Sequence, residues 1–107
     1  MQTFRVGEVV LVNFPFADAG EVKRRPALIL VDTGDEDVVV ARITGHMART
    51  EHDVNITQWR ESGLVVPSVV RVHKLATIQK RLVERRLGVL GSNNWLSVRE
   101  KLLALWF

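Results

Sequence analysis

The sequence predicts a mainly β fold with short helices: a small SH3-like barrel of about five to six strands, followed by a C-terminal amphipathic helix. Three observations predict this class. Short runs rich in β-branched residues recur between residues 7 and 90, the first runs are joined by connections too short for crossover helices, and helical spacing is clear only near the end. The 107 residues fit one domain, residues 1–107.

The first part of the chain predicts three antiparallel strands. Residues 7–14 (GEVVLVNF) alternate around two valines and form the first strand. Residues 14–26 combine two prolines and a glycine with a polar centre, which predicts a mobile loop of about ten residues. The apolar run at 27–33 (ALILVDT) is typical of a strand buried on both faces, and 37–44 (DVVVARIT) follow after a short turn. The connections favour a meander over a βαβ unit.

The middle of the chain carries weaker signals. We expect a short strand at 52–56 and one helical turn at 58–62. Period-two alternation returns at 68–75 (SVVRVHKL), which predicts another strand. Residues 77–90 predict a short turn of helix and then a final strand.

The last residues predict an amphipathic helix. Asn93 or Asn94 would be its N-cap. One apolar stripe follows at three- and four-residue spacing and contains Trp95, Val98, Leu102 and Leu105. Trp59, Trp95 and Trp106 are expected in the core or in a dimer interface.

Composition excludes several classes of protein. With 47% hydrophobic and 25% charged residues, the chain is expected to fold around a core. The absence of cysteine removes disulfides, thiolate nucleophiles and cysteine metal sites. No apolar run approaches the roughly 18 residues of a membrane span, and the N-terminus lacks signal-peptide features, so we expect a cytoplasmic protein without membrane contact.

Charge is distributed unevenly. The net charge is −3 up to Ala41 and +6 from Arg42 onward. A surplus of guanidinium groups suits a polyanion, although a solvated basic surface is the commoner reason for a mild positive charge. The histidines at 46, 52 and 73 fit no metal-binding motif, and no glycine-rich phosphate loop is present, so neither a metal nor a cofactor is expected.

Arg25 and Thr44 are the first candidate site residues. Pro26 biases Arg25 towards an extended backbone, so that its guanidinium can project and clamp a phosphate. Lys23 and Arg24 extend this basic run, which taken alone is more typical of a solvated loop end. The hydroxyl of Thr44, at the end of the strand 37–44, can donate to a phosphate oxygen. Because the two strands adjoin through a tight turn, we expect Arg25 near Thr44.

Arg71 and His73 form the second candidate pair, since residues two apart on a strand share a face. Histidine titrates near neutrality, which makes His73 the best available general acid or base. A half-buried histidine bonded to the backbone is an equally good interpretation. His46 and His52 lie in a polar connection and are expected to be exposed.

In order along the chain, the segments GEVVLVNFPF, KRRPALIL, ARIT and SVVRVHKLATIQKRL resemble the PemK/MazF family of toxin endoribonucleases from about Gly7 to Leu90. The resemblance implies a toxin of a type II toxin–antitoxin module, an SH3-like barrel, a homodimer, and metal-independent, sequence-specific cleavage of single-stranded RNA to a 2′,3′-cyclic phosphate and a 5′-hydroxyl. The family's catalytic arginine falls on Arg25 and its strand-end threonine on Thr44. Where some members have an arginine and, two residues on, an aspartate, this chain has Arg71 and His73. The general base therefore stays open, with His73 as the candidate.

The resemblance also implies partners. An antitoxin with a disordered tail is expected to fold over the RNA groove. Phe16 is a candidate for stacking on a base while Lys23, Arg24 and Arg71 follow the phosphates, although Phe16 fits the core equally well. Two rival functions are a non-catalytic CcdB-like toxin that binds gyrase and an SH3-like nucleic-acid-binding module without chemistry. The joint occurrence of Arg25, Thr44 and the strand pattern favours the enzyme.

Overall fold

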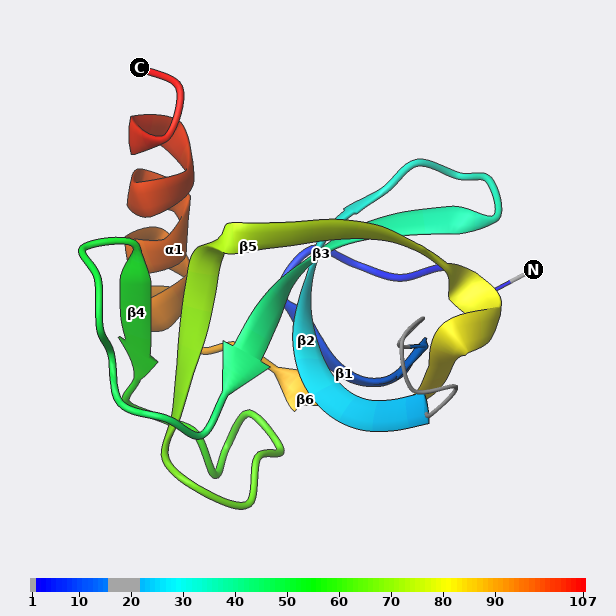
Figure 1. Ribbon diagram of the computed structural model, residues 1–107, viewed down its shortest axis with the longest axis horizontal. Helices are drawn as coiled ribbons and strands as arrows, with labels where there is room; N and C mark the ends of the chain where they lie inside the picture. The colour runs from blue at the N-terminus through cyan, green and yellow to red at the C-terminus, as the bar shows by residue number, and fades with distance from the viewer. Residues whose placement is uncertain (1, 16–21) are drawn as a thin grey trace.

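The computed structural model describes residues 2–15 and 22–107, which form a six-stranded antiparallel sheet and one α-helix (Figure 1). The strand order is β4-β5-β3-β2-β1-β6. The elements are β1 (Glu8–Pro15), β2 (Val22–Asp32), β3 (Asp37–Thr44), β4 (Asp53–Ile56), β5 (Ser68–Gln79), the 3₁₀ turn η1 (Lys80–Leu82), β6 (Val83–Val89) and α1 (Ser92–Ala104).

The predicted fold class is confirmed: the chain is mainly β with one C-terminal helix. The sheet curves like a small barrel, and the long β5 bends sharply and then crosses the view beneath the turn between β2 and β3 (Figure 1). Register shifts interrupt the β1–β6, β2–β3 and β3–β5 ladders, and such irregularities let strands bend. Within the described ranges β4 and β6 remain the two edges of the sheet, so the barrel is not closed.

Strand β2 separates two apolar cores, as its continuous apolar run predicted. Leu28 and Leu30 enter one core and Ala27 and Ile29 the other. The first core also contains Val9, Ala41, Ile43, Val70, Val72 and Val98. The second core also contains Phe4, Val10, Val12, Val38, Val40 and Ile78.

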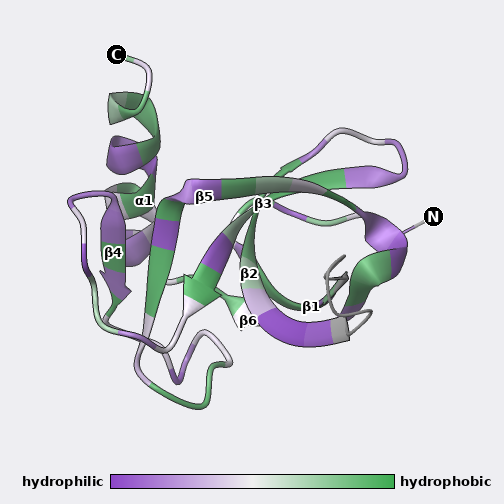
Figure 2. Ribbon diagram, in the orientation of Figure 1, coloured by the Kyte–Doolittle hydropathy of each residue, from purple (hydrophilic) through white to green (hydrophobic). Residues whose placement is uncertain are grey.

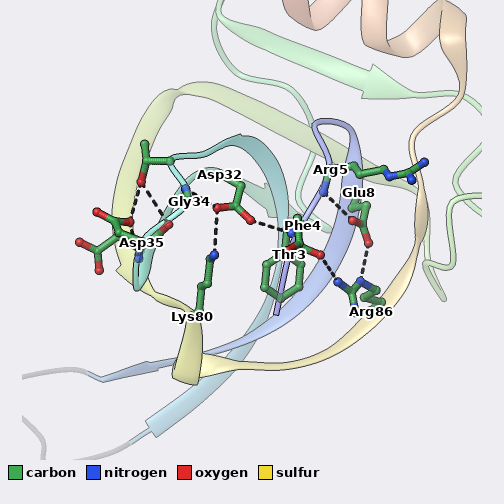
Figure 3. Close-up of polar contacts among 11 residues, drawn as sticks. Thr3, Phe4, Arg5, Glu8, Asp32, Gly34, Asp35, Lys80 and Arg86 are labelled. Atoms are coloured by element: carbon green, nitrogen blue, oxygen red, sulfur yellow. Dashed lines mark hydrogen bonds and ion pairs between the residues drawn. The ribbon is translucent and has the colours of Figure 1, made fainter. Parts of the chain in front are cut away.

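Asp32, at the end of β2, ties the N-terminal segment to the sheet (Figure 3). Its carboxylate accepts hydrogen bonds from the backbone N–H groups of Phe4 (2.7 Å) and Gly34 (2.9 Å) and pairs with the buried Lys80 ammonium (2.9 Å). The Phe4 N–H, Lys80 and the Gly34 N–H together lower the pKa of Asp32 from 3.8 to about 2. Phe4 is thereby held over the second core, with the Arg86 guanidinium 4.5 Å from its ring centre.

Helix α1 packs on the first core through the predicted stripe. Val98 is fully buried, and Trp95, Leu102 and Leu105 pack against the same core. The predicted asparagine N-cap is wrong, because the N-cap is Gly91, without a side-chain capping bond. None of the helices in the described part of the chain is long and apolar enough to cross a membrane.

The buried Asn94 instead connects the helix to the end of β4. Its amide nitrogen donates to the hydroxyl of Thr57 (3.1 Å) and to the carbonyl oxygen of Asn55 (3.4 Å), and its amide oxygen accepts from the Gln58 N–H (3.4 Å). These contacts satisfy the polar groups of an otherwise apolar interface.

Two strands differ from their predicted lengths. The loop predicted for 14–26 is wrong over 22–26, where β2 already pairs with β1 and Arg25 lies opposite Val12; residues 16–21 lie outside the described residues. Strand β5 continues to Gln79, beyond the predicted end at residue 75, because its second half pairs with β3. The predicted short helical turn and final strand at 77–90 correspond to η1 and β6.

The turn that follows β4 packs backbone to backbone on β6. Gly63 has a φ of +87°, and a Cβ atom there would overlap the carbonyl group of Leu87. A Cβ atom on Gly88 would overlap the carbonyl group of Ser62. Glycine at both positions therefore permits the close approach.

Candidate functional site

A cavity of about 490 Å³ opens where β2 begins and β3 ends. Arg24, Arg25 and Pro26 line one side, and residues 42–46 line the other. The segment before β5 completes the wall with Leu64, Val65, Val66 and Ser68. We call this space the arginine cavity. The start of β2, which lines it, is hydrophilic (Figure 2).

The register of β2 and β3 explains why Arg25 and Thr44 both reach this cavity. The ladder pairs Ala27 with Arg42. Two residues farther along the same antiparallel register, Arg25 and Thr44 fall at corresponding positions, and residues so related lie on one face of a sheet. Ala27 fills the second core from that face, so the apolar interior gives way to a polar site at the open end of the two strands.

The arginine cavity is strongly cationic. Arg24, Arg25 and Arg42 line it, and no carboxylate does so within the described ranges. Arg25 is exposed and its Nη1 donates to the carbonyl oxygen of Arg24 (3.2 Å), which orients the guanidinium while leaving N–H donors for a ligand. Arg24 pairs with Glu84 (3.2 Å) and is partly neutralised. Of the two, Arg25 is the stronger anion-binding group.

The Thr44 hydroxyl is oriented as a donor. Its oxygen accepts a hydrogen bond from the backbone N–H of His46 (3.2 Å), so the hydroxyl proton remains available for another acceptor. The His46 side chain is exposed and lines the arginine cavity. From the sequence His46 was predicted only to be exposed; its position two residues after Thr44 was the available signal for a place in the site.

His73 and Arg71 lie in a different cluster. Neither lines the arginine cavity. The Arg71 Nε is 3.3 Å from the Asp53 Oδ1, and the rings of His52 and His73 are 5.3 Å apart. The cause is a break in the β3–β5 register, where Ala41 pairs with Leu75 and Arg42 pairs with Arg71, so residues 72–74 have no counterparts on β3.

Charge and burial set the protonation of this cluster. Burial and then the nearby Arg71 lower the pKa of His73, and its buried Nδ1 has no hydrogen-bond partner among the described residues. Burial raises the pKa of Asp53, but the N–H groups of Arg49 and Thr50 and the Arg71 guanidinium outweigh it, so the pKa lies below its ordinary value. His73 is therefore a neutral imidazole near pH 7, beside an ion pair.

Two other residues predicted to bind RNA are Lys23 and Phe16. Lys23 is exposed on β2 opposite Phe14. Phe16, a candidate for base stacking, lies outside the described residues. Residues 2–15 and 22–107 contain no group of three or more His, Cys, Asp or Glu side chains that could hold a metal ion.

Comparison with known proteins gives one family and several similar folds. The family model described as PemK-like, MazF-like toxin of type II toxin–antitoxin system matches residues 5–106. The Mycobacterium tuberculosis toxin MazF-mt6 is 25% identical, over 89% of this chain and 91% of that chain, with a TM-score of 0.73.

Two complexes are also similar in fold. A MazE–MazF crystal structure from Deinococcus radiodurans is 21% identical, over 98% of this chain and 96% of that chain, with a TM-score of 0.76. An endoribonuclease in complex with its cognate antitoxin, from a mycobacterial species, is 17% identical, over 95% of this chain and 93% of that chain, with a TM-score of 0.77. No curated protein sequence matches this chain significantly.

Proposed function

The chain belongs to the family of PemK-like, MazF-like toxins of type II toxin–antitoxin systems, and on that premise we propose that it is a sequence-specific endoribonuclease that cuts single-stranded RNA without a metal ion. The observation that carries the proposal is the arginine cavity, which Arg25 and Thr44 line together with two further arginines, Arg24 and Arg42. In this reaction the ribose 2′-oxygen attacks the adjacent phosphorus and the bond from phosphorus to the 5′-oxygen breaks. The products are a 2′,3′-cyclic phosphate and a 5′-hydroxyl, so RNA supplies its own nucleophile.

Arg25 stabilises the negative charge that develops on the phosphate oxygens. A guanidinium binds two of these oxygens at once, and preorganised donors of this kind provide the largest contribution to many such reactions. A role as general acid is disfavoured, because a guanidinium gives up its proton reluctantly in proteins. Thr44 donates its free hydroxyl proton to a phosphate oxygen and so fixes the orientation of the diester.

Two proton transfers complete the chemistry: one proton leaves the 2′-hydroxyl and one reaches the departing 5′-oxygen. We assign one of them to His46, because its imidazole lines the same cavity as Arg25 and Thr44. His73 remains the alternative, since its lowered pKa keeps the imidazole neutral and able to accept a proton.

The expected partners follow from the same premise. The similar mycobacterial endoribonuclease forms a complex with its cognate antitoxin, and we propose that a cognate antitoxin of this chain covers the arginine cavity and blocks RNA. We also propose a homodimer, which the resemblance to the family implies. We propose a cytoplasmic location because the proposed substrate is messenger RNA.

The test is cleavage of a long single-stranded RNA by the purified protein in EDTA. We expect discrete fragments whose 5′-hydroxyl ends accept a label from polynucleotide kinase without prior phosphatase treatment. A 2′-deoxy substitution at the cut position should abolish that cut. Binding without fragments would favour a nucleic-acid-binding module, and neither binding nor fragments would favour a toxin that acts on a protein.

Arg25→Ala should lower the cleavage rate by roughly 10²–10³-fold or more, as loss of one transition-state donor does elsewhere. Arg85→Ala is the matched control, because Arg85 is exposed on β6 and lines no part of the cavity. Circular dichroism checks that both variants fold. Wild-type rates in a folded Arg25→Ala protein would refute the site assignment.

A further inference from the structure

A second cavity, of about 410 Å³, adjoins the arginine cavity. The two share Gly45, His46 and Ser68 as lining residues. The connection that carries Gly45 and His46 runs from the end of β3 past the start of β5 to β4 (Figure 1). A strand of RNA with a phosphate in the first cavity therefore meets the second directly.

Strand pairing fixes the distance between Thr44 in the arginine cavity and Asn55 in the second cavity. Val69 on β5 pairs with Thr44 on one side and with Asn55 on the other, so these residues form one row across three strands. With a strand spacing of about 4.8 Å, Thr44 and Asn55 lie roughly 10 Å apart. A single nucleotide spans such a gap between its phosphate and the edge of its base.

The second cavity differs chemically from the first. Among the described residues, no lysine, arginine, aspartate or glutamate lines it. The residues that line it include the apolar Ile56, Trp59 and Pro67 and the highly exposed Met47, whose side chain is flexible. A mostly apolar, uncharged cavity fits a planar heterocycle and gives a phosphate no countercharge.

Asn55 supplies the polar recognition group. Asn55 lines the cavity and is exposed on the face of β4 opposite the buried Val54 and Ile56, and no hydrogen bond within the described ranges uses its amide, although its backbone oxygen accepts from Asn94. A carboxamide has a donor and an acceptor side by side, which is the pattern needed to bond the edge of an unpaired base. The contact between Asn94 and the Asn55 backbone holds this part of β4 against α1.

We propose that the second cavity binds the base of a nucleotide next to the cleaved phosphate, and that Asn55 reads its hydrogen-bonding edge. This inference rests on the proposed function and extends it from cleavage to choice of sequence. The arginine cavity holds the backbone, whereas the neutral cavity selects the base, so catalysis and specificity depend on different residues.

The experiment compares wild-type, Asn55→Ala and Asn55→Asp proteins on an RNA pool randomised around a cut site, with the cleaved ends sequenced. Asn55→Ala should relax the preference at one position by at least roughly fivefold, as loss of a paired base contact does. Asn55→Asp replaces the donor by an acceptor and should change which base is preferred there. Asn93→Ala is the matched control, because Asn93 is exposed on α1 and lines neither cavity.

The outcomes separate the two proposals. A folded Asn55→Ala protein that cuts every sequence with the wild-type preference would overturn the base-reading role, as would equal loss of cleavage on all sequences. If the wild-type protein cuts no RNA, the proposed function fails and the inference falls with it. Relaxed preference in Asn55→Ala, together with rate loss without relaxation in Arg25→Ala, would support both.

Discussion

Replacing Gly63 by alanine tests the close packing of the turn at 57–63 on β6. At Gly63 an alanine meets two penalties: a left-handed φ of +87° and overlap with the Leu87 carbonyl group. Gly34 has a similar φ of +83°, but an added Cβ atom there would meet open space. A Cβ atom added to Gly88 would overlap the Ser62 carbonyl group, although the φ of Gly88 is not left-handed. The three glycines therefore isolate backbone strain, steric overlap and their combination.

The magnitudes follow from these geometries. Left-handed backbone costs a residue with a Cβ atom about 1–2 kcal/mol, which is the whole effect expected for Gly34→Ala. Forcing backbone apart in a packed region costs typically about 1–3 kcal/mol, the effect expected for Gly88→Ala. Gly63→Ala should combine both and lower the free energy of unfolding by about 2–5 kcal/mol.

Urea unfolding followed by circular dichroism measures these differences. With a slope of about 1–3 kcal/mol per molar urea, an additional 2 kcal/mol shifts the midpoint by roughly 1 M. Gly63→Ala should have the lowest midpoint and Gly34→Ala the highest of the three variants. Equal midpoints for Gly63→Ala and Gly34→Ala would show that the turn does not approach β6 as closely as described.

Two further predictions concern protonation. Because the pKa of Asp32 is about 2 in the folded chain, its contacts stabilise the fold above about pH 4, and this stability is lost as the pH falls towards 2. Asp32→Asn should therefore be less stable at pH 7. Its free energy of unfolding, measured by urea unfolding at several pH values, should also fall less between about pH 4 and pH 2 than that of the wild type. An equal fall in both proteins would contradict the role of its contacts. His46→Gln should slow RNA cleavage and alter its pH–rate profile, whereas His73→Gln should leave the shape of the profile intact; the reverse result would assign the proton transfer to His73.

The sequence predicted the elements whose structure is determined locally. The strand at 37–44 was predicted with the bounds of β3, because β-branched alternation and a short preceding turn define it without distant contacts. The presence of Arg25 and Thr44 in one cavity also agrees with expectation, since a tight connection between β2 and β3 sets their register. Their catalytic roles stay predictions.

Long-range contacts explain what the sequence did not predict. Asn94 was expected to cap α1, but it bonds to Thr57, 37 residues away in sequence, and that burial outweighs its capping preference. The wall of the arginine cavity also includes Leu64, Val65 and Val66 from the segment before β5, a contact with the ends of β2 and β3 that no local pattern reports. The break in the β3–β5 register, which separates Arg71 and His73 from Arg25, is equally invisible to strand periodicity.

The placement of β2 between two apolar cores has a consequence for how the chain denatures. Both cores pack against the same strand, through Leu28 and Leu30 on one side and Ala27 and Ile29 on the other. If either core unfolded, one face of β2 would be exposed to water and the hydrogen bonds of β2 to β1 and β3 would weaken. The other core depends on these same strand pairs. The molecule has no subdomain boundary along this strand, and we expect it to melt as one cooperative unit.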